Sequence, residues 1–289
     1  MAEVTTTTAA VFIPEVWEEA ILDYAERQFR IKNQVTNVSD VASGDTIHVP
    51  RVSEETAGTL SSGSAVSFGA NTDGEVQISM DSHIVEGKRI GDLVRVQSSY
   101  DLFNLYSRSM GYSVAKKIEN VLALLMQTAT ANDVSLGTDN TFTTAKVREG
   151  LQKLLDQGVD YTMGDTFFYA SPAGFMSLAS LGEFSDYEKR GPEDGGGSGP
   201  NINGMIKKIY GMEVYASVDW DDDGGSGDET GTIFTRDSIL YAEQFPLRVQ
   251  QSYNLEYLAT ELVVDQLIGA ALHQATDAAA CQVVNFNNP

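Results

Sequence analysis

The chain has 289 residues, and its 41 acidic residues outnumber its 19 lysines and arginines, which gives a formal net charge of −22. A surface this acidic repels phosphates and anionic lipids, so a broad face that binds nucleic acid or a membrane is disfavoured. The hydrophobic fraction of 42% is still large enough to bury a sizeable core, and no run of about 18 apolar residues is present to span a membrane. We expect one large or two medium folded domains.

The first part of the chain predicts a loose arm followed by a short helix. Residues 1–12 are rich in threonine and lack the basic and apolar regions of a secretion signal, so we expect a protein made in the cytosol. Pro14 suits the first position of a helix, and Trp17, Ile21 and Tyr24 then fall on one apolar side.

Between Val38 and Val96 apolar residues alternate with polar ones, which is typical of strands. One strand is predicted at 46–49 and another at 76–80, and a tract rich in Gly, Ser and Thr joins them. Two strands alone bury too little apolar surface to be stable in water. We therefore expect this long hairpin to be stabilised by another molecule.

A single long amphipathic helix is predicted from Ser98 to Thr130, and we expect it to act as a spine for the rest of the chain. Such a helix would be about 45 Å long, more than the width of a small domain. Strands and other segments should lie along it, with copies of the chain nearby. The apolar residues that recur every three or four positions are Leu102, Leu105, Tyr112, Ala115, Ile118, Leu122 and Leu125.

The segment 144–242 alternates helices and strands, as in a compact α/β subdomain. A helix is predicted after Thr143 or Thr144, a buried strand at 165–170, and a second helix after Ser171. Further strands are predicted at 212–216, 232–234, 239–242, 249–253, 255–264, 267–272 and 282–286. The predicted fold class is α+β, with two unequal lobes.

An acidic loop contains the strongest candidate for a metal site. Asp219, Asp221 and Asp223 place carboxylates at positions one, three and five, with Gly224 at six, as in a calcium-binding loop. The twelfth position is Thr230, where such loops need a bidentate glutamate, and the flanking segments are predicted strands. We interpret the loop as a solvated turn, and calcium binding is the alternative that a calorimetric titration would test.

No catalytic or cofactor-binding motif is present in the sequence. His48, His83 and His273 are far apart and match no zinc motif, so we interpret them as surface or partly buried residues. Cys281 is the one cysteine; we expect a small buried side chain rather than a nucleophile, and no intrachain disulfide. We predict that the protein is not an enzyme and that it has no catalytic residues and no cofactor.

Four segments follow one another in a recognisable order. They are Phe12–Trp17, Gly44–Pro50, the helix from Gln97 to Thr130, and Gly211–Ser217. In this order and spacing they resemble the major capsid proteins of tailed bacteriophages, which have the Hong Kong 97-type fold. The resemblance implies an N-terminal arm, an extended hairpin loop, a peripheral domain with the spine helix, and an axial domain.

The resemblance also implies domain boundaries and partners. The domains would be 1–37 for the arm and short helix, 38–96 for the extended hairpin loop, 97–143 with 243–289 for the peripheral domain, and 144–242 for the axial domain. The Gly-rich stretch 191–200 would be a mobile loop at the exposed edge of the axial domain. The chain would assemble with itself into hexamers and pentamers of an icosahedral shell around phage double-stranded DNA. Its other partners would be a separate scaffolding protein, a portal and decoration proteins, with assembly in the host cytoplasm and a final location in the virion capsid.

Charge and lysine content lead to two further expectations. Packaged DNA must slide past the wall, so we expect acidic residues to line the inner face of the shell. The predicted hairpin tip, 56–74, contains no lysine, and Lys88 lies near its base. We therefore expect non-covalent contacts between subunits rather than isopeptide bonds.

The closest alternative is an encapsulin-like cellular compartment, which shares the fold and encloses an enzyme; the neighbouring genes would distinguish the two. A hydrolase would be revealed by an activity screen with substitution of Asp219 and His48. A monomeric calcium-binding adhesin would be recognised by light scattering.

Overall fold

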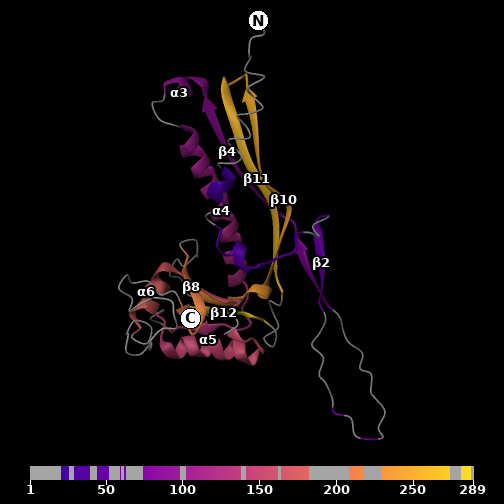
Figure 1. The fold of residues 1–289 in the computed structure, drawn as a ribbon, viewed down its shortest axis with the longest axis vertical. Helices are drawn as coiled ribbons and strands as arrows, with labels where there is room; N and C mark the ends of the chain where they lie inside the picture. Colours follow the sequence, from indigo (N-terminus) through magenta and orange to yellow (C-terminus); the bar gives the residue numbers. More distant parts are fainter. Residues whose placement is uncertain are drawn as a thin grey trace.

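The computed structural model combines a long spine with a lobe at one end of it (Figure 1). The residues that it describes are 21–25, 29–39, 44–51, 59, 62, 74–97, 102–137, 141–161, 164–181, 208–217, 229–273 and 281–287. The predictions for the arm at 1–20, for most of the hairpin tip and for the Gly-rich and acidic loops lie outside these ranges. Among the helices described, none is both long and apolar enough to cross a membrane.

The predicted spine helix is confirmed as α4 (Leu102–Gln127), whose 26 residues extend over about 39 Å. A stripe of buried residues four positions apart faces the sheet: Met110, Val114, Ile118, Leu122 and Met126. The prediction that Leu105 and Tyr112 lie on this stripe is wrong, because both are exposed. Tyr112 is two residues beyond Met110, and this places it about 200° around the helix, on the opposite side.

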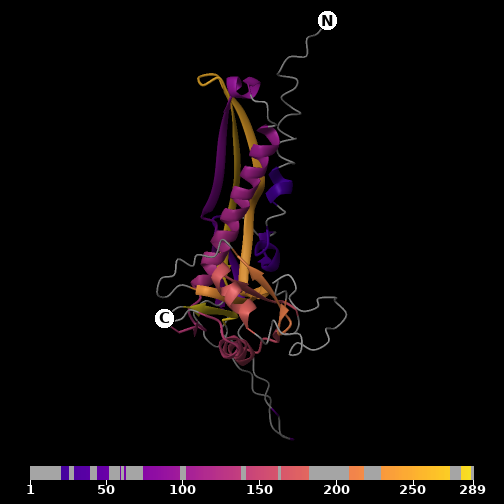
Figure 2. The ribbon, with the colours of Figure 1, turned by 90° about the vertical axis from the view of Figure 1, so that its left-hand side faces the viewer.

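The spine sheet has four strands in the order β1-β10-β11-β4. Their bounds are Thr36–Asn37 for β1, Ile239–Asn254 for β10, Ala259–Leu272 for β11 and Ser82–Gly91 for β4. A face of this sheet packs on α4 along its length (Figures 1 and 2). The strands predicted at 239–242 and 249–253 are one strand, because Pro246 lies at a register shift between Phe245 and Arg248. A proline is tolerated at such an irregularity, where no ladder hydrogen bond is lost.

Two further predictions about strands are corrected. The strands predicted at 255–264 and 267–272 are one strand, β11, and residues 255–258 form the turn before it. Alternation was predicted as far as Val96, but residues Asp92–Gln97 form helix α3. The strand before this helix, β4, pairs with β11, so within this chain it belongs to the spine sheet.

The hairpin strands are confirmed as β2 (Thr46–Arg51) and β3 (Gly74–Ser79), which pair antiparallel. They lie on the side of the spine sheet that faces away from α4 (Figure 1). Short 3-10 helices, Lys32–Gln34 and Arg236–Ser238, lie before β1 and β10.

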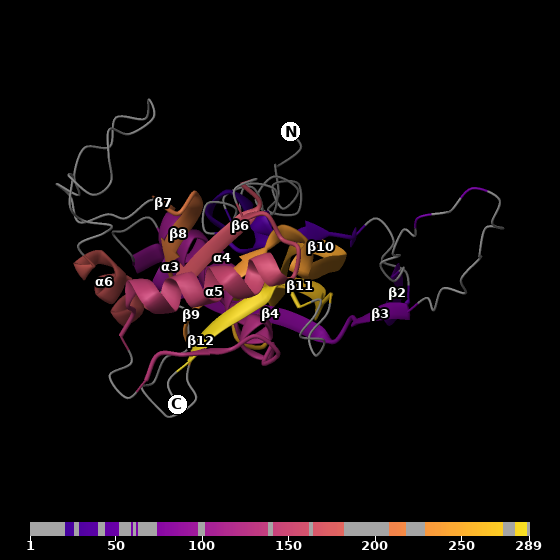
Figure 3. The same cartoon turned by 90° about the horizontal axis from the view of Figure 1, so that it is seen from below.

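The lobe is built on a six-stranded sheet in the order β5-β12-β9-β6-β8-β7. The strands are Val134–Ser135 (β5), Val283–Asn287 (β12), Glu229–Thr235 (β9), Thr166–Ala170 (β6), Met212–Ala216 (β8) and Lys208–Ile209 (β7). Helices α5 (Thr144–Asp156) and α6 (Pro172–Ser180) complete it (Figure 3). Thr143 and Ser171 cap them as predicted, because each side-chain oxygen accepts a hydrogen bond from a backbone N–H three residues on.

The lobe core is aromatic and closely packed. The ring of Phe286 lies 5.2 Å from that of Phe142 and 5.6 Å from that of Phe168, measured between centroids. Helix α5 approaches this cluster at Gly150, where an added Cβ would lie 2.5 Å from Phe286 Cζ. A glycine weakens a helix by about 1 kcal/mol relative to alanine, and here it allows α5 to pack directly on the ring.

Candidate assembly surfaces

The β2–β3 hairpin lies on the spine sheet through a very small core. Its own buried apolar side chains are Ile47, Ile78 and Met80, and the sheet contributes Leu240 and Ala242. This small core agrees with the prediction that the hairpin cannot form one by itself. The described part of the hairpin is stabilised by the spine sheet of the same chain.

A glycine on β11 sets how closely the hairpin approaches the sheet. A Cβ on Gly269 would lie 2.6 Å from the Ser79 carbonyl oxygen and 2.6 Å from Met80 Sδ. The backbone oxygen cannot move aside easily, so any larger side chain at 269 would push the hairpin away.

The end of the spine far from the lobe carries apolar side chains that face solvent. Helix α3 and the turn between β10 and β11 meet there, because Gly91 pairs with Ala259 at the ends of β4 and β11. Leu93 is 68% exposed and Leu255 is 78% exposed. We call the whole set the apolar tip: Leu93, Val94, Tyr253, Leu255, Tyr257 and Leu258.

Hydrogen bonds hold α3 against this turn. The Asp92 backbone N–H donates to the Leu258 carbonyl at 3.0 Å, and the Tyr253 hydroxyl donates to Asp92 Oδ2 at 2.7 Å. The Arg89 guanidinium lies 4.1 Å from the centre of the Tyr257 ring. The apolar tip is thus displayed in a defined geometry, which reduces the entropy lost when a partner covers it.

The backbone of the turn is strained at one position. Leu258 has φ = 46°, in the left-handed region that a bulky side chain seldom adopts. Strain of this kind costs about 1–3 kcal/mol and persists where the surrounding contacts or the function require it. At Leu258 it accompanies an exposed apolar side chain.

A buried carboxylate joins three strands on the outer face of the spine sheet. Asp265 accepts hydrogen bonds from Arg248 Nε at 2.8 Å and Arg248 Nη2 at 2.7 Å, and it lies 3.0 Å from His83 Nε2. The hydrogen bonds from Arg248, with a smaller contribution from His83, lower the pKa of Asp265. Because these contacts link residues of β4, β10 and β11, we assign the cluster the role of holding the three strands together.

A second buried carboxylate anchors the N-terminal segment to the spine helix. Glu119 of α4 accepts hydrogen bonds from the backbone N–H groups of Arg30, Ile31 and Lys32, at 3.1, 2.8 and 3.1 Å. Three donors satisfy most of the acceptor capacity of the carboxylate, which makes its burial tolerable.

The histidines that the sequence singled out are exposed or partly buried, as predicted. His48 Nδ1 lies 3.0 Å from Glu75 on the hairpin, His83 contacts Asp265, and the His273 backbone N–H donates to Ser238. Within the described part of the chain, no three His, Cys, Asp or Glu residues come together as metal ligands would. The calcium candidates Asp219, Asp221 and Asp223 lie outside that part.

Cys281 is buried, as predicted, and its thiol donates to the Val283 carbonyl at 3.5 Å. Sequence reasoning missed the apolar tip and both buried carboxylates. The tip could have been suspected, because Leu255, Tyr257 and Leu258 crowd apolar residues into a short polar interval. Nothing in the sequence distinguishes Glu119 or Asp265 from the other 39 acidic residues.

Comparisons with known proteins identify the fold. No family model matches the sequence, and no curated protein matches it. Solved structures do match: the capsid of cyanophage P-SCSP1u aligns at 15% identity with a TM-score of 0.72, covering 90% of this chain and 88% of that one. The mature capsid of bacteriophage PhiM1 aligns at 10% identity and TM-score 0.68, with 90% and 86% covered.

A virus-like particle from Pyrococcus furiosus also aligns, at 10% identity and TM-score 0.61, with 94% of this chain and 98% of that one covered. Such low identities establish the fold alone. The chain therefore has the α+β fold of tailed-phage capsid proteins, and the resemblance found in the sequence is confirmed.

Proposed function

We propose that this chain is the major capsid protein of a tailed phage, which assembles into hexamers and pentamers of an icosahedral shell around double-stranded DNA. The observation that carries the proposal is the apolar tip, displayed on a fold that is otherwise found in phage capsids. Large apolar side chains gathered at one exposed place mark an interaction surface. A shell subunit would cover them with copies of itself.

The remaining parts of the proposal follow the resemblance. The chain would divide at 37, 96, 143 and 242 into arm, hairpin loop, peripheral and axial domains, with 243–289 returning to the peripheral domain. Assembly would take place in the host cytoplasm with a separate scaffolding protein and a portal, and decoration proteins would bind outside. The shell would be structural rather than catalytic, and its subunits would be joined by non-covalent contacts.

Electron microscopy of the full chain, purified alone and after co-expression with a scaffolding protein encoded beside it, tests the proposal. We expect closed particles of uniform size. The variant Leu93→Asp with Leu255→Asp should abolish them, because a carboxylate buried without a partner is strongly unfavourable. The variant should remain folded, since both side chains are exposed in the isolated chain.

Met176→Asp provides a matched control. Met176 lies on α6 of the lobe and is 70% exposed, so one aspartate, instead of two, replaces an exposed apolar residue away from the tip. The control should still form particles. Particles formed by the double variant, or a wild-type chain that stays monomeric with every candidate scaffold, would contradict the proposal.

A cellular compartment remains the second candidate, because the Pyrococcus furiosus particle aligns over nearly its whole chain. Nuclease treatment of particles from the native source separates the two. A phage capsid yields protected double-stranded DNA, and a compartment yields a cargo protein without it.

A further inference from the structure

The outer edge of the spine sheet carries backbone groups that the sheet itself does not use. Strand β4 is the last strand of this sheet, and in the described part of the chain no strand pairs with its other side. In Figure 2 it is the purple strand along the left border of the spine, and α4 crosses in front of the sheet. Such an edge offers N–H and C=O groups to a strand from another chain.

The pairing with β11 shows which backbone groups of β4 face this edge. The Asp92 backbone N–H donates to the Leu258 carbonyl at 3.0 Å, and this pair continues the register of β4 and β11. In an antiparallel ladder, pairs that exchange hydrogen bonds alternate with pairs that do not. The even-numbered residues of β4 are therefore bonded to β11. The odd-numbered residues direct their backbone groups outward, and they are His83, Val85, Gly87, Arg89 and Gly91.

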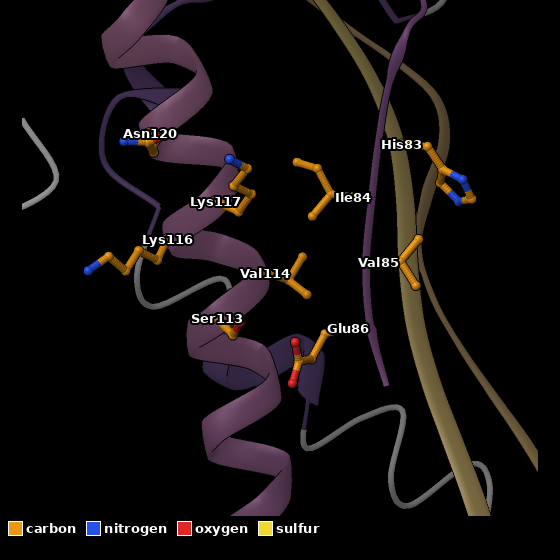
Figure 4. Close-up of a pocket in the computed structure, with 9 residues that line it drawn as sticks. All are labelled: His83, Ile84, Val85, Glu86, Ser113, Val114, Lys116, Lys117 and Asn120. Atoms are coloured by element: carbon orange, nitrogen blue, oxygen red, sulfur yellow. The ribbon is translucent and has the colours of Figure 1, made fainter. Parts of the chain in front are cut away.

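The side chains of β4 follow the same alternation. In Figure 4, Ile84 and Glu86 point from β4 toward α4. His83 and Val85 point away from the helix, and Val85 is 51% exposed. A groove of about 530 Å³ lies between α4 and β4. There is thus space beside the even-numbered side chains for those of an added strand.

Strand β4 lacks two of the features that usually block a free edge. It contains no proline, and it pairs with β11 without a register shift. It does carry charges, but Glu86 and Lys88 have opposite signs, lie on the same face on either side of Gly87, and are 3.1 Å apart. An antiparallel copy of β4 centred on Gly87 would therefore meet complementary charges.

We infer that two copies of this chain pair antiparallel along their β4 edges, about a twofold axis at Gly87. Glu86 then lies opposite Lys88 of the second copy, and Ile84 lies opposite Ile90 of the second copy. Outward backbone groups meet outward backbone groups, so the segments 83–91 form about ten hydrogen bonds with each other. The two spine sheets become one continuous sheet.

The charges of β4 select this register over its neighbours. A shift of two residues in one direction places Glu86 opposite Glu86 of the second copy, and the opposite shift does the same with Lys88. Like charges directly opposite each other are destabilising. A shift of one residue sets outward backbone groups against inward ones and turns each side chain to the wrong face. The register centred on Gly87 avoids both faults.

This pair goes beyond the proposed function and does not depend on it. In the proposed shell it would join two subunits across a twofold axis. The segment 83–91 is shorter than the roughly 20–30 residues a side of a standard interface, so we expect a weak dimer in solution. Other contacts between subunits would add avidity in a shell.

Gly87→Cys tests the position of the axis. A Cβ at this position lies 3.8 Å from its nearest neighbour, an ordinary contact, so the cysteine fits. Opposed residues of a hydrogen-bonded pair have Cα atoms about 5.5 Å apart, within the range of a disulfide. We expect mild oxidation of the full-length variant to give a disulfide-linked dimer on non-reducing gels. Gln250→Cys, exposed on β10 in the same cross-strand row, is the matched control and should stay largely monomeric.

Glu86→Lys and Lys88→Glu test the register. Each single variant places like charges opposite each other at two points, so the dissociation constant of the dimer should rise roughly tenfold or more in sedimentation equilibrium. The double variant restores opposite charges at the wild-type net charge and should dimerise as wild type does. These proteins also carry Leu93→Asp and Leu255→Asp, so that the apolar tip does not contribute to association.

Amide hydrogen exchange gives a readout of the edge itself. The odd-numbered amides of 83–91 should exchange quickly in the dilute monomer and slowly in the dimer, while the even-numbered amides stay protected by β11 in both. Odd-numbered amides that are already protected in the monomer would overturn the inference, because another segment of the same chain would then cover the edge.

Three further results would overturn the inference. They are a tip variant that stays monomeric at the highest concentration, a Gly87→Cys chain that cross-links no faster than Gln250→Cys, and a double charge variant that dimerises as weakly as the single ones. Failure of the proposed function looks different. A chain that forms no particles but passes these tests refutes the shell and keeps the pair, and particles unaffected by every β4 variant refute the pair alone.

Discussion

The lobe and the spine differ in where they place polar and apolar side chains. The lobe encloses an aromatic cluster, and a polar residue buried in it, Asn285, donates hydrogen bonds to two carbonyl oxygens. The spine buries the side chains of Glu119, Asp265 and Gln266 and leaves the apolar tip in solvent. The aromatic cluster of the lobe is thus covered within the chain, whereas the apolar tip of the spine remains available for contacts with other molecules.

The two regions differ in when the burial of their apolar side chains contributes to stability. Burial of apolar area stabilises a protein by about 25 cal/mol per Å², and side chains left exposed at the tip contribute that term only when a partner covers them. The lobe gains this stabilisation from packing within one chain. We therefore expect substitutions in the lobe to change the stability of the subunit and substitutions at the tip to change assembly.

The largest effect on stability is expected from Phe286→Ala in the lobe. Phe286 is fully buried against Phe142 and Phe168, and removal of such a ring costs about 3–5 kcal/mol. Urea unfolding of the subunit measures the change. Met176→Ala, at an exposed position, should change the free energy of unfolding by no more than about 0.5 kcal/mol. A loss of less than about 1 kcal/mol for Phe286→Ala would mean that Phe286 is not closely packed in the lobe core.

A gain is expected from Gln266→Leu in the spine. Gln266 is fully buried, and neither atom of its amide has a hydrogen-bond partner in the part of the chain that is described. A leucine of similar size removes the desolvation cost of these atoms, so the free energy of unfolding should rise by about 1–3 kcal/mol. The same substitution at the exposed Gln250 should change the free energy of unfolding little. A lower free energy of unfolding for Gln266→Leu would show that the Gln266 amide forms hydrogen bonds.

Asp265→Asn tests the carboxylate that joins the spine strands. The hydrogen bonds from Arg248 lower the pKa of Asp265 in the folded state. The ionised carboxylate therefore contributes fully to stability above the unfolded-state pKa of about 3.9, and this contribution is lost as the pH falls through the folded-state pKa. The variant should lose about 1–2 kcal/mol at neutral pH and show a weaker fall in stability below pH 4. Asp81→Asn, at an exposed position next to β4, is the matched control; an equal effect there would refute the role given to Asp265.

Local signals predicted much of the fold from the sequence. The caps at Thr143 and Ser171 and the apolar run at 166–170 each act within a few residues, so the lobe helices and the strand between them were predicted well. The repeat of apolar residues every three or four positions in α4 was equally clear. The lobe elements could be predicted because residues close to one another in the sequence determine them.

The spine strands were harder to predict from the sequence because their pairing partners are distant along the chain. Pro246 and Asp265 each break the apolar alternation, and only pairing between β10 and β11 shows how the chain accommodates them. The helix at Asp92–Gln97 has only six residues, too few to show a clear apolar period, and the assignment of β4 to the spine depends on β11, about 180 residues later. The apolar tip was missed for the same reason, since it forms where α3 meets the turn at 255–258.

The smallest effect on stability, about 1 kcal/mol or less, concerns the strained turn at the apolar tip. Leu258→Gly relieves the left-handed backbone and removes the side chain, whereas Leu258→Ala removes the side chain and keeps the strain. Glycine should therefore make the isolated subunit more stable than alanine by up to about 1 kcal/mol in urea unfolding. Both variants should weaken assembly, because both remove an exposed apolar contact.

The two substitutions together separate strain from contact. Equal stability of the glycine and alanine variants would mean that the turn is unstrained, and normal particle formation by both would mean that Leu258 contacts no partner. A glycine variant that is more stable and assembles less well is the combination expected of a tip maintained for contacts between subunits, since natural sequences keep strained residues where function depends on them.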